Sequence, residues 1–418
     1  MRNSFAFVLL FGIFLKCQCE GPASFRGDRV VRATPKNKAQ LQYLVSLEDK
    51  ADVNLDFWTH PSQEGAPVDI HITKAEYPKL AKQLHAEGIT FTILITDVQT
   101  LLDNENPPSR SERAGFDYGR YNQLKQIEEE MQNLVYTYRN LATMVTEFGQ
   151  SYEGRTIRAI KISSNPGAGR KVFFFNCGIH AREWVTPATC MIILKQMLSK
   201  YGKDSSVTQM VDKLDWVIMP VFNVDGYVFT QQNRMWRKTT SRNAGTSCMG
   251  TDPNRNWNFA WAGVGTSSNP CSDTYHGSRP FSEVEVRNVA RYLYRNRRRL
   301  IGYMDIHAYS QLWMTPWGYK RAYPSDYSEL KRVSDVAVKA LYNEYGTRYR
   351  VGPSSIIIYA NSGSTKDWAY GVLRVKYAFA LELRDTGRYG FALPANQIMP
   401  TGMETFAAIK AMAMELQL

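Results

Sequence analysis

Short apolar runs alternate with helical spacing along most of the chain after residue 114. Runs at 171–175, 216–221 and 377–381 are rich in the β-branched and aromatic residues typical of buried strands. Residues 187–201 and 283–300 show the spacing of amphipathic or buried helices. This alternation predicts an α/β fold with a mixed, mostly parallel twisted sheet and helices on both faces.

A smaller unit precedes this domain. The runs at 45–47 and 68–72 predict strands, 77–86 predicts a helix closed by Gly88, and 90–96 predicts a further strand. The order strand, strand, helix, strand predicts a small α/β sandwich.

Residues 103–113 separate the two units. The segment is polar, contains prolines and lacks apolar periodicity, which is typical of a linker that proteases reach. Arg110 and Arg113 suit a trypsin-like activating protease. We therefore interpret residues 20–113 as a propeptide and 114–418 as the mature domain.

The first nineteen residues have the layout of a secretory signal peptide. Arg2 precedes an apolar run over 5–15 that ends near the small residues Cys17 and Cys19. No later stretch reaches the roughly 18 apolar residues that a transmembrane helix requires. The sequence predicts cleavage near residue 19 and a secreted, extracellular protein that makes no membrane contact.

Cysteine usage agrees with export. Without the leader, four of the six cysteines remain, and an even number in an oxidising compartment predicts disulfides. The alternative for any one of them is a buried free thiol. Among the three possible pairings we favour Cys177 with Cys190 and Cys248 with Cys271, because each closes a short local loop.

Positive charge is concentrated in the mature domain. Residues 114–418 hold 38 Lys and Arg against 25 Asp and Glu, whereas 21–113 hold 11 against 13. Five arginines between 291 and 299 lie at the end of a predicted helix, which predicts either a solvated face favoured by the helix dipole or contact with a heparin-like polyanion. Aromatic residues are not interleaved as in a nucleic-acid platform, so no nucleic-acid partner is expected.

His180 and Glu183 form the most informative chemical pattern. A histidine and a glutamate three residues apart, across a strand-to-helix turn, can converge on one cation, and a His2Glu set with an open fourth position is a catalytic zinc arrangement. The mature region holds two further histidines. His307 ends an apolar, strand-like stretch where α/β sheets present functional side chains, so it is the better third ligand. His276 lies in a polar turn and is interpreted as structural.

Read together, the motifs resemble the zinc metallocarboxypeptidases of the pancreatic A/B type, in the same order from about residue 116 to the C-terminus. The segments that carry the resemblance are His180-x-x-Glu183, Asn233-Arg-Met-Trp-Arg237, Asp252-Pro-Asn254-Arg255, His307-Ala-Tyr309, Tyr359 and Leu381-Glu382-Leu-Arg-Asp-Thr-Gly-Arg. The propeptide resembles that family's activation segment. The resemblance implies a carboxypeptidase-like fold, peptide C-termini as substrates, and a monomer.

The resemblance also implies the roles of individual residues. One zinc ion per chain would be held by His180, Glu183 and His307, with Glu382 as general base and Arg237 opposing the charge of the oxyanion. The alternative for Glu382 is a buried structural carboxylate paired with an arginine. Residues implied to bind substrate or to orient a ligand are Asn254 and Arg255 at the terminal carboxylate, Tyr359 over the terminal residue, Arg182 and Tyr309 at outer subsites, and Asp252 behind His180.

The pocket-floor position departs from both common types. Lys366 stands where A-type enzymes have an aliphatic residue and B-type enzymes an acidic one. Ser354, Asn361 and Ser364 nearby are polar, while Met314 and Ile358 are apolar. An ammonium group beneath a polar pocket predicts a preference for C-terminal glutamate, which resembles that of digestive carboxypeptidases of insects and suggests a gut lumen.

Three alternatives remain at this point. Lys366 could pair with its neighbour Asp367 or turn to solvent. The enzyme could then be of the A type, acting on aliphatic or aromatic C-termini. The chain could also be a secreted peptide-binding member of the family without catalysis, although Glu382 and Arg237 are both present.

Overall fold

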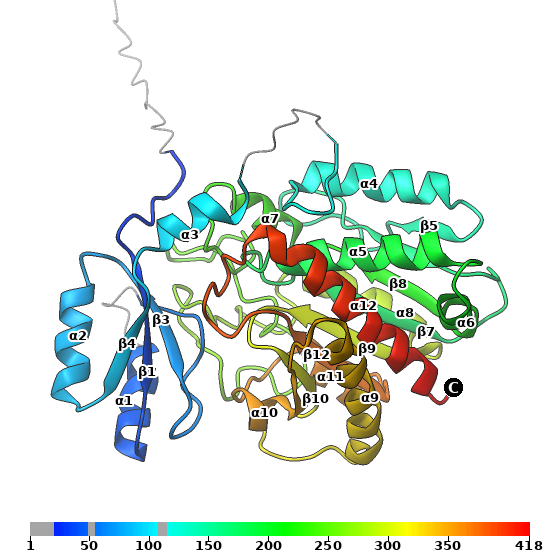
Figure 1. Cartoon of the computed structure of the whole chain (residues 1–418). Coiled ribbons are helices and arrows are strands. Elements are labelled where there is room, and N and C mark those ends of the chain that lie inside the picture. The colour runs from blue at the N-terminus through cyan, green and yellow to red at the C-terminus, as the bar shows by residue number, and fades with distance from the viewer. Residues whose placement is uncertain (1–20, 49–54, 108–114) are drawn as a thin grey trace, which may run out of the picture.

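The computed structural model describes residues 21–48, 55–107 and 115–418 (Figure 1). The predicted leader and both candidate cleavage sites, Arg110 and Arg113, lie outside these residues. Across the described ranges, no helix combines the length and apolarity that a membrane crossing needs.

The N-terminal unit is a four-stranded antiparallel sheet in the order β2-β3-β1-β4, joined with helices around its own apolar core. Its elements are β1 (Arg29–Thr34), α1 (Lys38–Glu48), β2 (Leu55–Phe57), β3 (Val68–Ile72), α2 (Tyr77–Ala86), β4 (Thr90–Ile95) and α3 (Val98–Glu105). This confirms the predicted small α/β sandwich, including the strands at β3 and β4 and the helix at α2.

The strand predicted at 45–47 is wrong, because these residues lie within α1. Leu44 and Leu47, three positions apart, are buried, whereas Val45 between them is 42% exposed. The burial follows helical spacing, and an apolar pattern of three residues was too short to distinguish the two periods. Strands β1 and β2 were not predicted.

The predicted linker begins later than expected. Helix α3 continues through residues 103–105, which the sequence assigned to the linker. Glu105 is buried and its Oε2 accepts a hydrogen bond from Nε of Arg234 at 2.8 Å. The residue that stabilises the end of α3 therefore comes from the other domain. The composition of residues 103–113 could not indicate this contact.

The C-terminal domain is built on one eight-stranded sheet in the order β11-β10-β12-β9-β7-β8-β6-β5. Four pairings are parallel (β11/β10, β12/β9, β9/β7, β7/β8) and three are antiparallel. The strands are β5 (Ala142–Val145), β6 (Ala159–Ile162), β7 (Val172–Cys177), β8 (Asp215–Met219), β9 (Leu300–His307), β10 (Leu312–Thr315), β11 (Arg350–Pro353) and β12 (Tyr377–Glu382). The predicted mixed, mostly parallel sheet is confirmed.

Helices cover both faces of this sheet, with α5 and α12 in front of the strands and α8 behind them in Figure 1. The helices are α4 (Leu124–Thr137), α5 (Val185–Lys200), α6 (Ser205–Lys213), α7 (Val224–Phe229), α8 (Val284–Asn296), α9 (Tyr327–Tyr345), α10 (Ser354–Ile357), α11 (Thr365–Gly371), α12 (Ile398–Glu415) and the 3-10 turn η1 (Ala395–Gln397). Between α7 and α8 the chain runs from 230 to 283 without a helix or strand of its own.

Both predicted disulfides are confirmed. Cys177–Cys190 links the end of β7 to α5, and Cys248–Cys271 closes a loop within the irregular segment 230–283. The first bond therefore ties the carboxyl end of β7 to the helix that follows it.

Candidate active site

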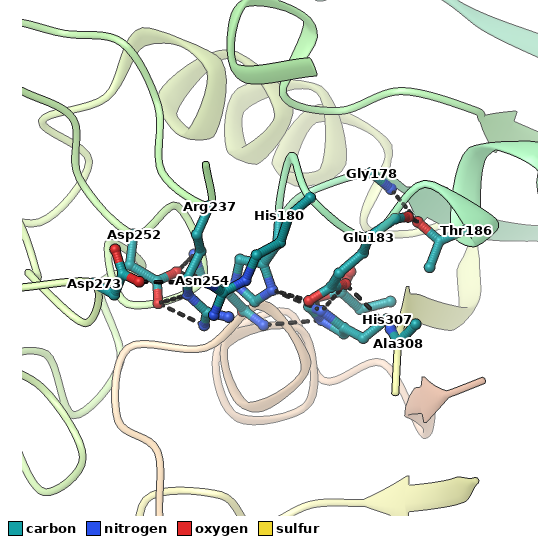
Figure 2. Close-up of polar contacts among 12 residues, drawn as sticks. Gly178, His180, Glu183, Thr186, Arg237, Asp252, Asn254, Asp273, His307 and Ala308 are labelled. Atoms are coloured by element: carbon teal, nitrogen blue, oxygen red, sulfur yellow. Dashed lines mark hydrogen bonds and ion pairs between the residues drawn. The ribbon is translucent and has the colours of Figure 1, made fainter. Parts of the chain in front are cut away.

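The three side chains predicted to bind a metal converge at the carboxyl ends of neighbouring strands. His180 and Glu183 lie in the turn from β7 to α5, and His307 is the last residue of β9 (Figure 2). His180 Nδ1 lies 2.7 Å from Glu183 Oε1, and His307 Nδ1 lies 3.2 Å from both Glu183 Oε2 and His180 Nδ1. All three side chains are buried, and their ligand atoms lie within 4.8 Å of one another.

This geometry fits a zinc ion. Ligands about 2.05 Å from a tetrahedral zinc lie about 3.3 Å from one another, close to the 3.2 Å between the two imidazole nitrogens. Burial raises the pKa of Glu183, but His180 and His307 outweigh burial and hold it below the usual range.

Carboxylates stand behind both imidazoles. His180 Nε2 lies 3.1 Å from Asp252 Oδ1, as predicted for an orienting partner, and His307 Nε2 lies 2.9 Å from Asp305 Oδ2. Asp305 was not predicted. It precedes His307 by two residues on the same strand, so alternation puts both side chains on one face, and that spacing was a usable signal.

Arg237 is held beside the metal-ligand cluster by Asp252. Its Nη2 and Nε donate to Asp252 Oδ2 at 2.8 and 3.2 Å, while the other oxygen of the same carboxylate faces His180. Burial raises the pKa of Asp252, but Arg237 and then Arg255 outweigh burial and hold it well below its usual range. The charged carboxylate thus fixes a guanidinium and a ligand histidine relative to each other.

Glu382 ends β12, directly opposite His307 in the parallel register of β12 and β9. In the part of the chain that the structure describes, no hydrogen bond or ion pair involves its carboxylate, whereas nearby Arg384 pairs with Glu404. Burial raises the pKa of Glu382 well above its usual range, although His307 opposes the effect. The alternative of a structural glutamate paired with an arginine therefore finds no support.

Most predicted substrate residues line one pocket next to this cluster. Its lining residues are His180, Asn254, Arg255, Asp305, His307, Met314, Ser354, Ile358, Tyr359, Asn361, Ser364, Thr365, Lys366, Ala380 and Glu382. Asn254 and Arg255 come from the irregular segment 230–283, which explains why no periodic pattern marked them.

Lys366 lies in this pocket and is paired with its neighbour. Its Nζ donates to Asp367 Oδ1 at 2.6 Å, and both side chains are buried. Asp367 also accepts hydrogen bonds from the backbone N–H groups of Gly318 and Tyr319. The alternative of pairing with Asp367 is therefore what the structure shows, yet the lysine remains part of the pocket wall.

Two serine hydroxyls in the pocket have no partner. Ser354 Oγ and Ser364 Oγ are buried, and neither makes a hydrogen bond within the described residues. Asn361 donates its Nδ2 to the carbonyl oxygen of Tyr359. Unpaired buried hydroxyls are costly, so this pocket is suited to a polar ligand.

The N-terminal domain covers the outer part of the site. Arg182 Nη1 donates to both oxygens of Asp56 at 2.8 and 2.9 Å, and Tyr309 donates its hydroxyl to Asp69 at 2.8 Å. Tyr359 meets the ring of His60 edge-on, with ring centroids 4.7 Å apart. Arg182, Tyr309 and Tyr359, which were predicted to contact substrate, are therefore contacted by this domain in the full chain.

Comparison with known families gives two matches. Residues 127–408 match the family model described as Zinc carboxypeptidase. Residues 31–105 match the one described as Carboxypeptidase activation peptide. The two matches correspond to the two domains of the fold.

Similar proteins cover nearly the whole chain. Carboxypeptidase A2 of Mus musculus is 42% identical over 416 residues, which is 98% of this chain and 97% of the relative. Carboxypeptidase A1 of Sus scrofa is 42% identical over 409 residues, or 96% and 95% of the two chains.

Solved structures agree in fold. The crystal structure of thrombin activatable fibrinolysis inhibitor has a TM-score of 0.84 at 33% identity and covers 93% of this chain and 98% of that one. Carboxypeptidase A from Helicoverpa armigera has a TM-score of 0.84 at 27% identity, with 94% and 98% covered.

Proposed function

Because this chain belongs to the zinc carboxypeptidase family and carries its activation peptide, we propose that the activated enzyme removes C-terminal glutamate from peptides. The chain is a zymogen of a zinc-dependent peptide hydrolase, and its activation peptide implies proteolytic activation. The preference for glutamate and the roles of individual residues are the parts we propose.

In this proposal His180, Glu183 and His307 would hold the zinc ion. Zinc in such a site would act as a Lewis acid and make a water molecule a stronger nucleophile at neutral pH. Asp252 and Asp305 keep the two imidazoles turned with Nδ1 toward the metal position.

Glu382 and Arg237 carry the remaining chemistry. In its ionised form, the Glu382 carboxylate would accept the proton of the attacking water and pass it to the leaving amine, a role that contributes about 10² to 10⁴ in rate. The Arg237 guanidinium, fixed by Asp252, opposes the negative charge that develops on the scissile carbonyl oxygen. That charge grows toward the transition state, so Arg237 lowers the barrier rather than only tightening binding.

Arg255 and Asn254 make the enzyme an exopeptidase. The hydrogen bonds of Arg255 within the described residues use Nε and Nη1, which leaves Nη2 for the substrate's terminal carboxylate. A peptide bond in the middle of a chain offers no such anion. Tyr359, which lines the same pocket, closes over the terminal side chain once the activation domain has left.

The single observation that carries the glutamate preference is the pocket's set of unused donors. The Lys366 ammonium has three protons and donates one of them to Asp367, and the Ser354 and Ser364 hydroxyls have no partner among the described residues. A glutamate carboxylate can accept from all three groups. An aliphatic or aromatic side chain would leave the hydroxyls unpaired, at about 1–3 kcal/mol for each buried group.

The competing candidate is an A-type enzyme for aliphatic or aromatic C-termini. The A-type names of the similar relatives favour it, as do the apolar Met314 and Ile358 in the pocket wall. The pairing of Lys366 with Asp367 also reduces the net charge of the pocket. A peptide binder without catalysis is less supported, because Glu382, Arg237 and the zinc-ligand set are brought together.

Peptides that differ in the last residue alone distinguish these candidates. We expect kcat/KM of the trypsin-activated enzyme to be about 10- to 150-fold higher for C-terminal Glu than for its neutral isostere Gln, and lowest for Arg. A tenfold advantage of Leu or Phe over Glu would establish the A-type candidate instead.

Activation and export complete the proposal. Cleavage at Arg110 or Arg113 by a trypsin-like protease would free the mature domain, and the leader would direct the zymogen to an extracellular space such as a gut lumen. N-terminal sequencing of the secreted and the trypsin-treated protein tests both steps. A mature N-terminus at any residue other than Ser111 or Ala114 would contradict the predicted sites.

A further inference from the structure

A dense group of cations lies where α8 ends, on a part of the molecule that the proposed catalytic function does not use. Arg291 and Arg295 are exposed and lie four residues apart on one face of α8, and the exposed Arg298 lies in the turn that follows the helix; we call these three residues the stripe. The segment before β7 lies beside them, because Lys171 Nζ donates to the carbonyl oxygen of Arg298 at 3.4 Å. We call this group the α8 basic face, and its members are Arg170, Lys171, Arg291, Arg295, Arg297, Arg298 and Arg299.

Acidic groups neutralise little of this charge. Arg299 pairs with the buried Asp215 at 2.8 Å, and Lys161 approaches the same carboxylate at 3.0 Å. The other six members form no ion pair within the residues that the structure describes. Burial raises the pKa of Tyr292, and the negative charges of Glu147 and Asp215 raise it further, which places both acids near this face. Like charges four residues apart destabilise a helix slightly, so the stripe has a cost that a bound polyanion would remove.

The helix dipole does not account for the whole face. Its attraction for cations is confined to the last turn, which holds Arg295 and leads into Arg297. Arg291 lies before that turn, and Arg170 and Lys171 belong to a different segment. The dipole therefore explains part of the stripe, and the convergence of two segments of chain needs a further reason.

The aromatic residues of this face favour one class of polyanion. The guanidinium of Arg297 covers the ring of Tyr294 at 4.1 Å, and Tyr292 packs on Phe148 with centroids 4.5 Å apart. Tyr292 is therefore engaged in packing, and Tyr294, which is 52% exposed, has one ring face covered by Arg297. One exposed ring does not make the row of aromatic side chains on which successive bases of a single-stranded nucleic acid stack. A sulfated polysaccharide needs spaced cations and no stacking platform. We propose that the α8 basic face binds a sulfated polysaccharide.

The face and the candidate active site lie at opposite ends of the same strands. Lys171 and Arg299 directly precede β7 and β9, whereas His180 and His307 lie at the carboxyl ends of these strands. Six residues of β7 span about 20 Å. In Figure 1 the activation domain lies at the left and α8 at the right. A polysaccharide bound to the α8 basic face would therefore leave the active site open. It could retain both the zymogen and the mature enzyme on a matrix.

The experiment measures the affinity of the full-length zymogen for heparin at several NaCl concentrations. The slope of log K against log salt grows by about one unit for each cation that contacts the polyanion. We therefore expect the variant Arg291→Gln/Arg295→Gln/Arg298→Gln, which loses three such contacts, to have a slope that is smaller in magnitude by about three. The control Lys79→Gln/Lys125→Gln/Lys339→Gln removes the same charge from other exposed positions and is expected to leave the slope unchanged. Equal slopes for the two triple variants would overturn the proposal.

Further arms test the class of partner and the integrity of the fold. Unsulfated dextran is expected to show no binding. Single-stranded DNA and anionic lipid vesicles are expected to compete only weakly with heparin for the zymogen. If either competes as strongly as free heparin does, the assignment to a polysaccharide is overturned. After activation, the triple variant is expected to hydrolyse a short peptide within about twofold of the native rate. If the triple variant does not fold, Arg298→Gln, which lies beyond α8, is expected to lower the slope by about one, and no change would overturn the proposal.

Discussion

Replacing Lys366 with methionine is expected to reverse the preference for the terminal residue. The substitution keeps most of the length of the side chain and removes the ammonium group from the pocket wall. A hydrogen bond to a charged group contributes about 1.5–3 kcal/mol. We therefore expect kcat/KM for Glu-terminal peptides to fall about 10- to 150-fold, with a smaller loss for Gln and a gain for Leu.

The neighbouring aspartate decides how this variant must be designed. Asp367 is buried and loses its cation in Lys366→Met, although the N–H groups of Gly318 and Tyr319 still donate to it. Breaking one side of a buried pair costs about 3–5 kcal/mol of stability. The double variant Lys366→Met/Asp367→Asn avoids the unpaired charge and is expected to show the same reversal in a more stable protein.

The assay compares kcat/KM on peptides that end in Glu, Gln, Leu and Phe. Lys366→Arg conserves the charge and is expected to keep the preference for acidic ends. Lys320→Met removes an exposed lysine from the adjoining loop and is expected to change nothing. The reasoning is refuted if both Lys366→Met and the double variant retain the native order of substrates.

Three further predictions concern the base, the zymogen and the pH dependence of stability. Glu382→Gln is expected to lose at least about a hundredfold in kcat while zinc content stays at one per chain. Retained activity would mean that another residue acts as the general base. Asp56→Asn removes the negative charge, and one of the two acceptor oxygens, with which the activation domain holds Arg182, so the uncleaved zymogen is expected to show about tenfold more residual activity on a small substrate, with unchanged activity after trypsin. Burial raises the pKa of Glu285 to about 7, so the folded state binds this proton more tightly than the unfolded chain does. The free energy of unfolding that this group contributes is fully present below pH 4.5 and is lost as pH rises through 7. Glu285→Gln is accordingly expected to be more stable than the native enzyme by about 3 kcal/mol at pH 8 and equal to it near pH 4.5; an equal difference at both values would contradict the shift.

Elements with long apolar patterns could be predicted from the sequence. Strands β7, β8 and β12 are buried on both faces, so each appears as a continuous apolar run, and α5 and α8 have enough turns for helical spacing to be recognised. The segment around Val45 is different, because its burial depends on Leu44 and Leu47 meeting the propeptide sheet. Local spacing alone could not show that contact.

The candidate site could be predicted in part. His180 and Glu183 are close in sequence, and His307 ends a strand, so local pattern found this set. Asp56 and Asp69, which meet Arg182 and Tyr309, come from the other domain and left no local signal.

The pairing of Lys366 illustrates a further limit. In the sequence, adjacency alone indicates Asp367 as a possible partner. A loop about fifty residues earlier brings the N–H groups of Gly318 and Tyr319 to the aspartate. Both the burial of the pair and these hydrogen bonds depend on that loop. The lack of hydrogen-bond partners for the Ser354 and Ser364 hydroxyls, within the described residues, likewise results from tertiary packing.

The most direct test of the central claim is a crystallographic anomalous difference map of the zinc-loaded enzyme, recorded at the zinc absorption edge. The account predicts one strong peak about 2.0–2.2 Å from His180 Nδ1, a Glu183 oxygen and His307 Nδ1. The absence of a peak among these three atoms at saturating zinc, or a peak held by other side chains, would contradict it.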